Sequence, residues 1–158
     1  MIRVGQGFDV HKFSTGRLCI IGGVIIDHPL GLQGHSDADV LLHAISDAIL
    51  GAAGLGDIGY HFPDNNPKFK DMSSRDILRI VVSLIGDEGY TVNNIDATVI
   101  CETPKISPYA KKMIENISED CLCELTQINI KATTTEGLGF TGRSEGIAAQ
   151  AICIIKAL

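Results

Sequence analysis

Two side chains with metal-binding chemistry lie two positions apart near the start of the chain, Asp9 and His11 in the run Gly-Phe-Asp-Val-His. On an extended backbone alternate residues point to the same side, so this carboxylate and imidazole would converge. A third ligand is needed, and His43 is the best candidate. One carboxylate oxygen and two imidazole nitrogens would leave a tetrahedral Zn²⁺ with one open position, as in catalytic rather than structural zinc sites. The pattern predicts such a zinc centre.

His43 also admits a simpler interpretation. It lies four residues after Asp39 and four before Asp47, so the three side chains form one stripe along a helix. Taken alone, such a histidine is more typical of a helix edge that faces water. Together with Asp9 and His11 the stripe favours a site, in which Asp39 or Asp47 is the candidate to fix the tautomer of the bound imidazole.

His35 and Ser36 precede the helix, where free backbone N–H groups and the positive end of the helix dipole form a natural seat for phosphate. The alternative is simple helix capping by Ser36. The glycine-rich loop at residues 54–59 lacks the Lys-Ser/Thr of a P-loop and indicates only a close approach of backbone to a partner. Asp57 in that loop is a candidate to accept hydrogen bonds from ribose hydroxyls.

The stretch from Lys131 to Arg143 combines three consecutive threonines, Glu136 and several glycines after a predicted strand. Such a stretch offers oxygen ligands for a hard cation and donors for an anion. A polar surface turn is the alternative.

The elements that would position these residues follow from hydrophobic periodicity and turn signals. The pattern predicts strands at 2–8 and at 18–26 (broken at Gly22-Gly23), a helix from Ser36 or Asp37 to Ala53, a helix from 73 to about 86, a strand over 95–102, a helix over 107–119, and strands at 128–132 and 147–156. The last segment has a helix as its alternative. This order predicts one α+β domain over residues 1–158, with helices packed on one face of a mixed β-sheet.

Composition excludes several classes of function. A chain of 158 residues that is 45% hydrophobic can build one real core, and a net charge of -6 without a Lys/Arg cluster argues against nucleic acid as a partner. No apolar run approaches the roughly 20 residues of a membrane span. The start of the chain shows no leader, which predicts a cytoplasmic protein. The five cysteines are odd in number and lie in apolar surroundings, which predicts reduced thiols; metal or redox pairing at Cys121-x-Cys123 is the less favoured alternative.

Five motifs spread over nearly the whole chain carry a resemblance to a known family. They are Gly-Phe-Asp-Val-His at 7–11, His-Ser-Asp-x-Asp-Val at 35–40, Gly-Asp-Ile-Gly at 56–59, Phe-Pro-Asp at 62–64 and Lys-Ala-Thr-Thr-Thr-Glu-x-Leu-Gly-Phe-Thr-Gly-Arg at 131–143. With these the chain resembles the 2-C-methyl-D-erythritol 2,4-cyclodiphosphate synthase family of the non-mevalonate isoprenoid pathway. The resemblance implies a phosphorus–oxygen lyase that forms the cyclic diphosphate and CMP from 4-diphosphocytidyl-2-C-methyl-D-erythritol 2-phosphate. It also implies a homotrimer with active sites between subunits.

The resemblance further implies roles for individual residues. Zn²⁺ would be bound by Asp9, His11 and His43, and a second divalent ion, Mg²⁺ or Mn²⁺, by Glu136. The implied catalytic residues are His35, Ser36, Thr134 and Glu136. Implied substrate contacts are Asp9, His11, His35, Ser36, Asp57, Ile58, Gly59, Phe62, Asp64, Lys105, Ala132, Thr133, Thr134, Thr135, Glu136, Phe140 and Arg143, of which Lys105, Ala132, Thr133 and Thr134 would line the cytidine pocket. Phe8, Arg143 and Glu145 would face a central cavity that can hold an isoprenoid diphosphate.

The chain departs from the family pattern at two places, and two other functions compete with the synthase. Gln6 stands where histidine is frequent, and Ile106-Ser107 follow Lys105 where bulkier apolar residues are common. A metal-dependent nucleotide phosphohydrolase would use the same metals and an in-line water. A trimeric binding protein with structural zinc would need a fourth protein ligand, and the sequence presents only three clear ones.

Overall fold

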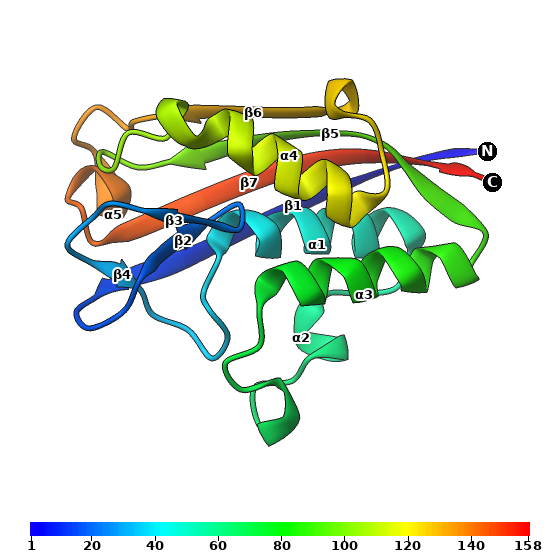
Figure 1. Ribbon diagram of the computed structural model, residues 1–158, viewed down its shortest axis with the longest axis horizontal. Helices are drawn as coiled ribbons and strands as arrows, with labels where there is room; N and C mark the ends of the chain where they lie inside the picture. Colours follow the sequence, from blue (N-terminus) through cyan, green and yellow to red (C-terminus); the bar gives the residue numbers. More distant parts are fainter.

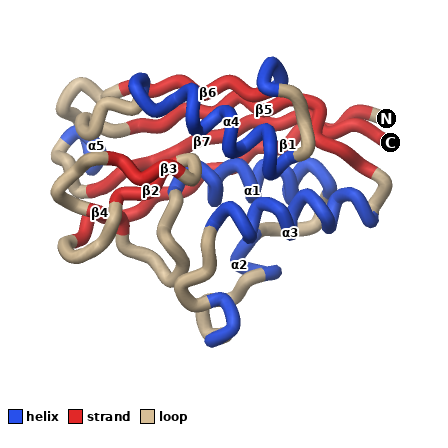
Figure 2. Tube along the Cα trace, in the orientation of Figure 1, coloured by secondary structure: helices blue, strands red, loops and turns tan.

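The main sheet has five strands in the order β4-β1-β7-β5-β6, described by a computed structural model of residues 1–158. β5 and β6 are parallel and the other neighbours are antiparallel, which confirms the predicted mixed sheet. A separate hairpin pairs β2 with β3 (Figure 2). The strands are β1 (Ile2–Ser14), β2 (Cys19–Ile21), β3 (Val24–Ile26), β4 (Gly31–Leu32), β5 (Tyr90–Ile100), β6 (Ile128–Thr133) and β7 (Gly146–Ala157).

Three longer helices lie on one face of this sheet (Figure 1), as the α+β prediction requires. They are α1 (Val40–Ala53), α3 (Ser74–Asp87) and α4 (Ala110–Cys121); the shorter helices are α2 (Ile58–His61), α5 (Gly139–Gly142) and the 3₁₀ turns Pro67–Phe69, Ser107–Tyr109 and Leu125–Gln127. None of the helices has both the length and the apolar character needed to cross a membrane. The segment from α2 through the first 3₁₀ turn projects from the body of the domain (Figure 1).

Two glycines set the distance between α1 and the sheet. A Cβ at Gly5 would lie 1.9 Å from the carbonyl oxygen of Ala48, and one at Gly7 would lie 1.9 Å from that of Ala44. Only glycine permits an approach this close, and the small alanines of α1 supply the matching helix face. Because residues of one strand alternate between faces, Gly5, Gly7, Asp9 and His11 all point toward the helices.

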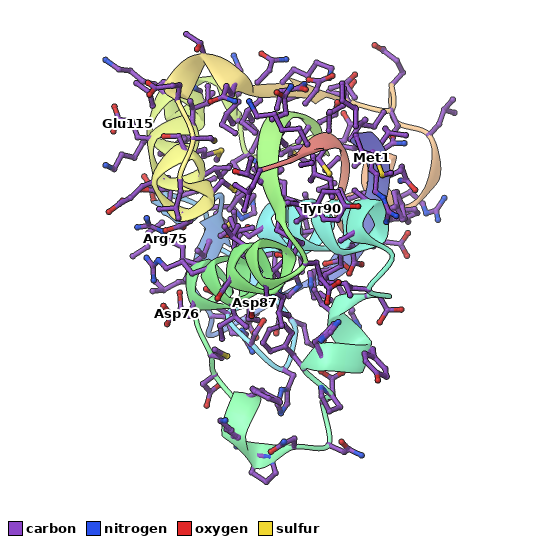
Figure 3. All side chains as sticks on the ribbon, turned by 90° about the vertical axis from the view of Figure 1, so that its right-hand side faces the viewer. Met1, Arg75, Asp76, Asp87, Tyr90 and Glu115 are labelled. Carbon is purple, nitrogen blue, oxygen red and sulfur yellow. The ribbon has the colours of Figure 1, made fainter.

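An ion-pair network joins α3 to α4. The buried carboxylate of Asp120 accepts hydrogen bonds from Arg75 Nε at 2.7 Å and from Arg79 Nε at 2.9 Å. Figure 3 shows Arg75 at the junction of the two helices. Removing one partner of such a buried pair costs far more than the pair contributes, so this contact fixes how the two helices pack.

Several predicted boundaries are wrong for identifiable reasons. β1 continues to Ser14 instead of ending at Phe8, because it pairs with β7 as far as Lys12 and with β4 at Phe13 and Ser14. The predicted strand at 18–26 is a hairpin that turns at Gly22-Gly23, both of which have positive φ angles. The strand predicted for the final segment is confirmed by β7, and only the alternative of a helix is wrong. Two short elements in glycine-rich segments, α2 and α5, had no periodic signal.

Candidate metal centre and active site

Three candidate ligands converge beside the first turn of α1. Asp9 and His11 extend the glycine face of β1 beyond the point where α1 covers it, and His43 lies in α1 next to Ala44. Asp9 Oδ2 is 2.9 Å from His11 Nε2 and 3.2 Å from His43 Nδ1, and the two nitrogens are 3.0 Å apart. Taking one ligand atom from each residue, all three lie within 4.8 Å of one another. The predicted trio therefore forms one cluster.

The opposite side of each imidazole is also occupied. His11 Nδ1 lies 2.7 Å from the carbonyl oxygen of Gln33, which makes Nδ1 the donor and leaves Nε2 free to coordinate. His43 Nε2 lies 3.1 Å from Ser36 Oγ and 3.0 Å from Ser74 Oγ. Partners of this kind orient metal-binding histidines, so the cluster fits a divalent ion such as zinc.

Electrostatics favour an ionised carboxylate at the centre of the cluster. Burial alone would raise the pKa of Asp9, but hydrogen bonds and charge interactions with His11 and His43 outweigh burial and lower this pKa to about 2. The pKa of His11 is raised because the hydrogen bond and charge of Asp9 outweigh the effect of its burial. The site therefore presents a carboxylate with two imidazoles, which suits a cation.

The predicted N-cap of α1 is wrong. The helix begins at Val40 and its N-cap is Asp39, not Ser36 or Asp37. The fully buried Asp39 carboxylate accepts the N–H groups of Gly22, Gly23 and Leu42 at 2.7 to 3.1 Å. Burial raises the pKa of Asp39 to about 6, although these N–H groups act in the opposite direction. Within α1 this carboxylate takes up the N–H of Leu42, one of the free donors of the first turn.

The carboxylates expected to orient His43 have other partners. Asp47 Oδ1 accepts the N–H of Ile58 at 2.8 Å and so ties the glycine-rich loop to α1. Two serines, one before α1 and one in the first turn of α3, take the place of Asp39 and Asp47 at the imidazole. No sequence pattern pointed to Ser74, because capping is a sufficient explanation for a serine near the start of a helix.

A cleft of about 250 Å³ opens over the cluster formed by Asp9, His11 and His43. It contains the three ligands and six other predicted site residues, namely His35, Ser36, Ile58, Gly59, Phe62 and Asp64. His35 Nδ1 and Asp64 Oδ1 lie 3.9 Å apart across it. Asp57 is exposed nearby, and its carboxylate caps α2 by accepting the N–H of Tyr60 at 2.9 Å. Sequence motifs separated by up to 50 residues therefore meet in one cavity.

A second, larger groove of about 540 Å³ lies beside the end of β6. Four residues predicted to line a cytidine pocket, Lys105, Ala132, Thr133 and Thr134, are all part of its wall. Ile106 and Ser107, where the chain departs from the family pattern, also contribute. This groove and the metal cleft share no residue within one chain.

The loop that carries Glu136 follows this groove. Glu136 is exposed and has a φ of 55°, and the N–H groups on either side of it, from Thr135 and Gly137, each lie 3.2 Å from Glu102 Oε1. Sequence reasoning gave Glu102 no role, because no pattern places its side chain beside a loop more than 30 residues away. Glu102 therefore determines the conformation of the turn that presents Glu136.

The remaining predicted contacts lie in or after the same loop. The Thr135 hydroxyl forms hydrogen bonds within the loop, 2.6 Å from the carbonyl oxygen of Leu138 and 2.8 Å from Thr141 Oγ1. Phe140 is 40% exposed, and Arg143 pairs with Glu145 at 2.9 Å. The loop is thus ordered by its own hydrogen bonds and leaves Glu136 and Phe140 facing outward.

Sequence comparisons find related proteins over nearly the whole chain. A sequence model described as the YgbB family matches residues 2–156. The 2-C-methyl-D-erythritol 2,4-cyclodiphosphate synthase of Methylobacillus flagellatus is 60% identical over 156 residues, covering 99% of this chain and 98% of that protein.

Solved structures agree. The chain superposes on an IspF–CDP complex from Plasmodium falciparum with a TM-score of 0.87 and 37% identity, covering 99% of this chain and 96% of that one. It also matches the bifunctional IspDF of Campylobacter jejuni with a TM-score of 0.96 and 43% identity, covering 100% of this chain but only 43% of that longer one. This chain therefore belongs to the YgbB family, the family of 2-C-methyl-D-erythritol 2,4-cyclodiphosphate synthases.

Proposed function

We propose that this protein converts 4-diphosphocytidyl-2-C-methyl-D-erythritol 2-phosphate to 2-C-methyl-D-erythritol 2,4-cyclodiphosphate and CMP, as a phosphorus–oxygen lyase of the non-mevalonate isoprenoid pathway in the cytoplasm. The observation that carries the proposal is the convergence of Asp9, His11 and His43 in a cleft that also contains His35, Ser36 and Asp64. Family membership supports the same reaction.

The chemistry requires two anions to meet. The 2-phosphate attacks the β-phosphorus within the same molecule, a ring closes and CMP leaves. A phosphate monoester is already largely dianionic at pH 7, with a second pKa of about 6, so the protein needs no strong base. It must instead hold the two phosphates together and compensate their charge.

Asp9, His11 and His43 would hold Zn²⁺, and Glu136 would contribute to a second site for Mg²⁺ or Mn²⁺. Divalent ions held there would neutralise phosphate charge and polarise the phosphorus–oxygen bonds. His35 and Ser36 in the cleft would bind the 2-phosphate end of the substrate. Asp57, Gly59 and Asp64 would contact its hydroxyl groups, with Ile58 and Phe62 as further contacts.

The groove beside β6 would accept the cytidine through Lys105, Ala132, Thr133 and Thr134, with Thr134 positioned to contact the diphosphate. Its volume of about 540 Å³ and its mixed polar and apolar lining fit a nucleoside. The relative from Plasmodium falciparum was solved as a CDP complex, which supports a nucleotide here. Thr135, Phe140 and Arg143 would complete the binding surface from the neighbouring loop.

The proposal includes a homotrimer whose active sites lie between subunits. Two features support an assembly. The metal cleft and the groove beside β6 are separate cavities in one chain, and the sheet face opposite the helices exposes Val4, Phe8 and Ile152 at 68, 53 and 47%. Exposed apolar side chains gathered on one face are typical of interfaces. Phe8, Arg143 and Glu145 would then surround a central cavity with room for an isoprenoid diphosphate.

The test is ³¹P NMR of the protein with the proposed substrate, Zn²⁺ and Mg²⁺, with and without a chelator. We expect CMP together with a coupled pair of cyclic diphosphate resonances, and we expect the chelator to abolish both. CMP without the cyclic product would show hydrolysis instead. An unchanged spectrum from folded, metal-loaded protein would contradict catalysis and favour a binding protein.

A further inference from the structure

The two serines at His43 do not have equivalent surroundings. His43 Nδ1 faces Asp9 and His11, so an imidazole that coordinates a metal there carries its proton on Nε2. Both Ser36 Oγ, at 3.1 Å, and Ser74 Oγ, at 3.0 Å, are within reach of that single N–H. The hydroxyl protons of the two serines, however, go to different places.

Ser74 has its proton committed to a carboxylate. Its hydroxyl donates to Asp37 Oδ1, and its backbone N–H donates to Asp37 Oδ2 at 3.0 Å. Ser74 is fully buried, at the start of α3. With both of its donors bound to Asp37, Ser74 presents a lone pair toward His43 and can act there only as an acceptor. The contact between Ser74 and His43 thus connects the three candidate metal ligands to α3.

Asp37 is itself held in place. Its Oδ1 also accepts the N–H of Asp39 at 3.2 Å, and its own N–H lies 3.3 Å from the carbonyl oxygen of Met72. The chain of contacts therefore runs from His43 through Ser74 to a carboxylate fixed between the loop before α1 and the segment before α3. Hydrogen bonds of a hydroxyl to a charged acceptor are stronger than neutral ones, so this connection is well defined.

Ser36 keeps its proton available. Its oxygen accepts the N–H of Ala38 at 3.2 Å and faces His43 Nε2, which has a proton of its own to donate when Nδ1 binds a metal. No other group of the chain takes the hydroxyl proton of Ser36, and Ser36 lies on the wall of the cleft. That proton is free to be donated to an anionic ligand in the cleft.

We propose that Ser74, held by Asp37, is the positioning residue that orients His43 for metal binding. The hydroxyl proton of Ser36 then stays free for the phosphate that the proposed function places in the cleft. The inference rests on the proposed function, because it assumes a metal at Asp9, His11 and His43. Ser74 plays the part for His43 that the carbonyl of Gln33 plays for His11.

The test compares zinc affinity, measured by competition with a chromophoric chelator, across single variants of the full-length protein. We expect Ser74→Ala to bind zinc about 10- to 100-fold more weakly, the usual cost of losing a partner of a metal-bound histidine. Ser73→Ala is the matched control, because it removes the neighbouring serine, which caps α3 without contacting His43. This control should bind zinc as the wild type does.

Ser36→Ala should separate the two roles. We expect zinc affinity close to that of the wild type and a marked loss of kcat/KM, because the hydroxyl is used by the substrate. If Ser74→Ala is poorly folded by circular dichroism, Asp37→Asn serves instead, since it keeps the size of the side chain and offers Ser74 only one acceptor oxygen. We expect weaker zinc binding in that variant also.

Equal zinc affinities in Ser74→Ala and Ser73→Ala, or a larger loss in Ser36→Ala than in Ser74→Ala, would overturn the inference. Such a result in a wild type that binds zinc and forms the cyclic product would leave the proposed function intact. A wild type that binds no zinc would refute the proposed function itself, so the two failures are distinguishable.

Discussion

The two regions proposed to bind metal ions are built in opposite ways. The side chains of Asp9, His11 and His43 project from a long strand and a buried helix, and every imidazole nitrogen faces a defined partner. Glu136 instead stands exposed on a turn whose two flanking N–H groups depend on one carboxylate, that of Glu102. The metal trio is preorganised by the whole fold, and the turn only by local contacts.

Because of this difference, the two regions should depend to different extents on the global stability of the fold. Side chains placed by core elements move only when those elements move, whereas an exposed turn can open without global unfolding. Replacing a residue that supports Asp9, His11 and His43 should therefore lower the free energy of unfolding. Replacing a residue that supports the turn at Glu136 should loosen that turn alone.

The largest expected effect is that of His43→Ala. Removing an imidazole ligand should abolish stoichiometric zinc binding and lower turnover at least about 10³-fold, because the metal supplies several kcal/mol of charge stabilisation. Zinc content and the rate of CMP release measure this. Ser46→Ala, in the same helix, removes a buried hydroxyl that has no hydrogen-bond partner and is the control. Retained turnover in metal-stripped His43→Ala protein would contradict the zinc assignment.

The second-largest effect is expected for Asp39→Ala. It leaves the buried N–H groups of Gly22 and Gly23 without an acceptor and removes the cap of α1, which should lower the free energy of unfolding by about 2 to 4 kcal/mol. Urea denaturation with chelator present measures this, with the exposed Asp87→Ala as control.

The pH dependence of this effect has a defined sign. The folded pKa of Asp39, about 6, exceeds the unfolded value of about 3.9. The contribution of Asp39 is therefore fully present below about pH 4 and declines as the pH rises through 6. The stability difference between wild type and Asp39→Ala should be larger at pH 5 than at pH 8. A difference that grows toward pH 8 would show that the Asp39 pKa is not raised.

Glu136→Gln tests the exposed turn. The substitution keeps the shape of the side chain but removes its charge, so we expect activity to fall roughly 100-fold with weaker dependence on Mg²⁺ or Mn²⁺. Zinc content and the free energy of unfolding should stay at wild-type values. Loss of zinc from this variant would show that the two regions are not separate.

Glu102→Ala should have the smallest effect on the molecule as a whole. We expect amide hydrogen exchange at Thr135 and Gly137 to accelerate about tenfold, which corresponds to about 1.4 kcal/mol of local opening. The global free energy of unfolding should change by less than about 0.5 kcal/mol. A loss as large as that in Asp39→Ala would remove the contrast between the two regions.

The sequence predicted the parts of this structure that depend on local pattern. Alternation and helical spacing identified the core strands and α1, α3 and α4, and the spacing of Asp9 and His11 indicated a shared direction. The convergence of His43 on that pair was an inference from side-chain chemistry, which the geometry of the cluster confirms.

Features that depend on tertiary contacts could not be predicted in this way. The continuation of β1 through Asp9 and His11 comes from its pairing with β7, which no local signal encodes. One partner of His43, Ser74, lies 31 residues away in the chain. Buried Asp39 takes the place of the expected cap because its carboxylate reaches the Gly22-Gly23 turn. Long-range partners of polar side chains were thus the main source of error.

The most direct test of a catalytic zinc at Asp9, His11 and His43 is X-ray absorption spectroscopy at the zinc edge of the loaded protein, with and without a bound substrate analogue. We expect two imidazole nitrogens and one carboxylate oxygen at about 2.0 to 2.2 Å, plus one light-atom ligand that changes when the analogue binds. A closed shell of four protein ligands, or a spectrum that the analogue leaves unchanged, would contradict a catalytic metal at Asp9, His11 and His43.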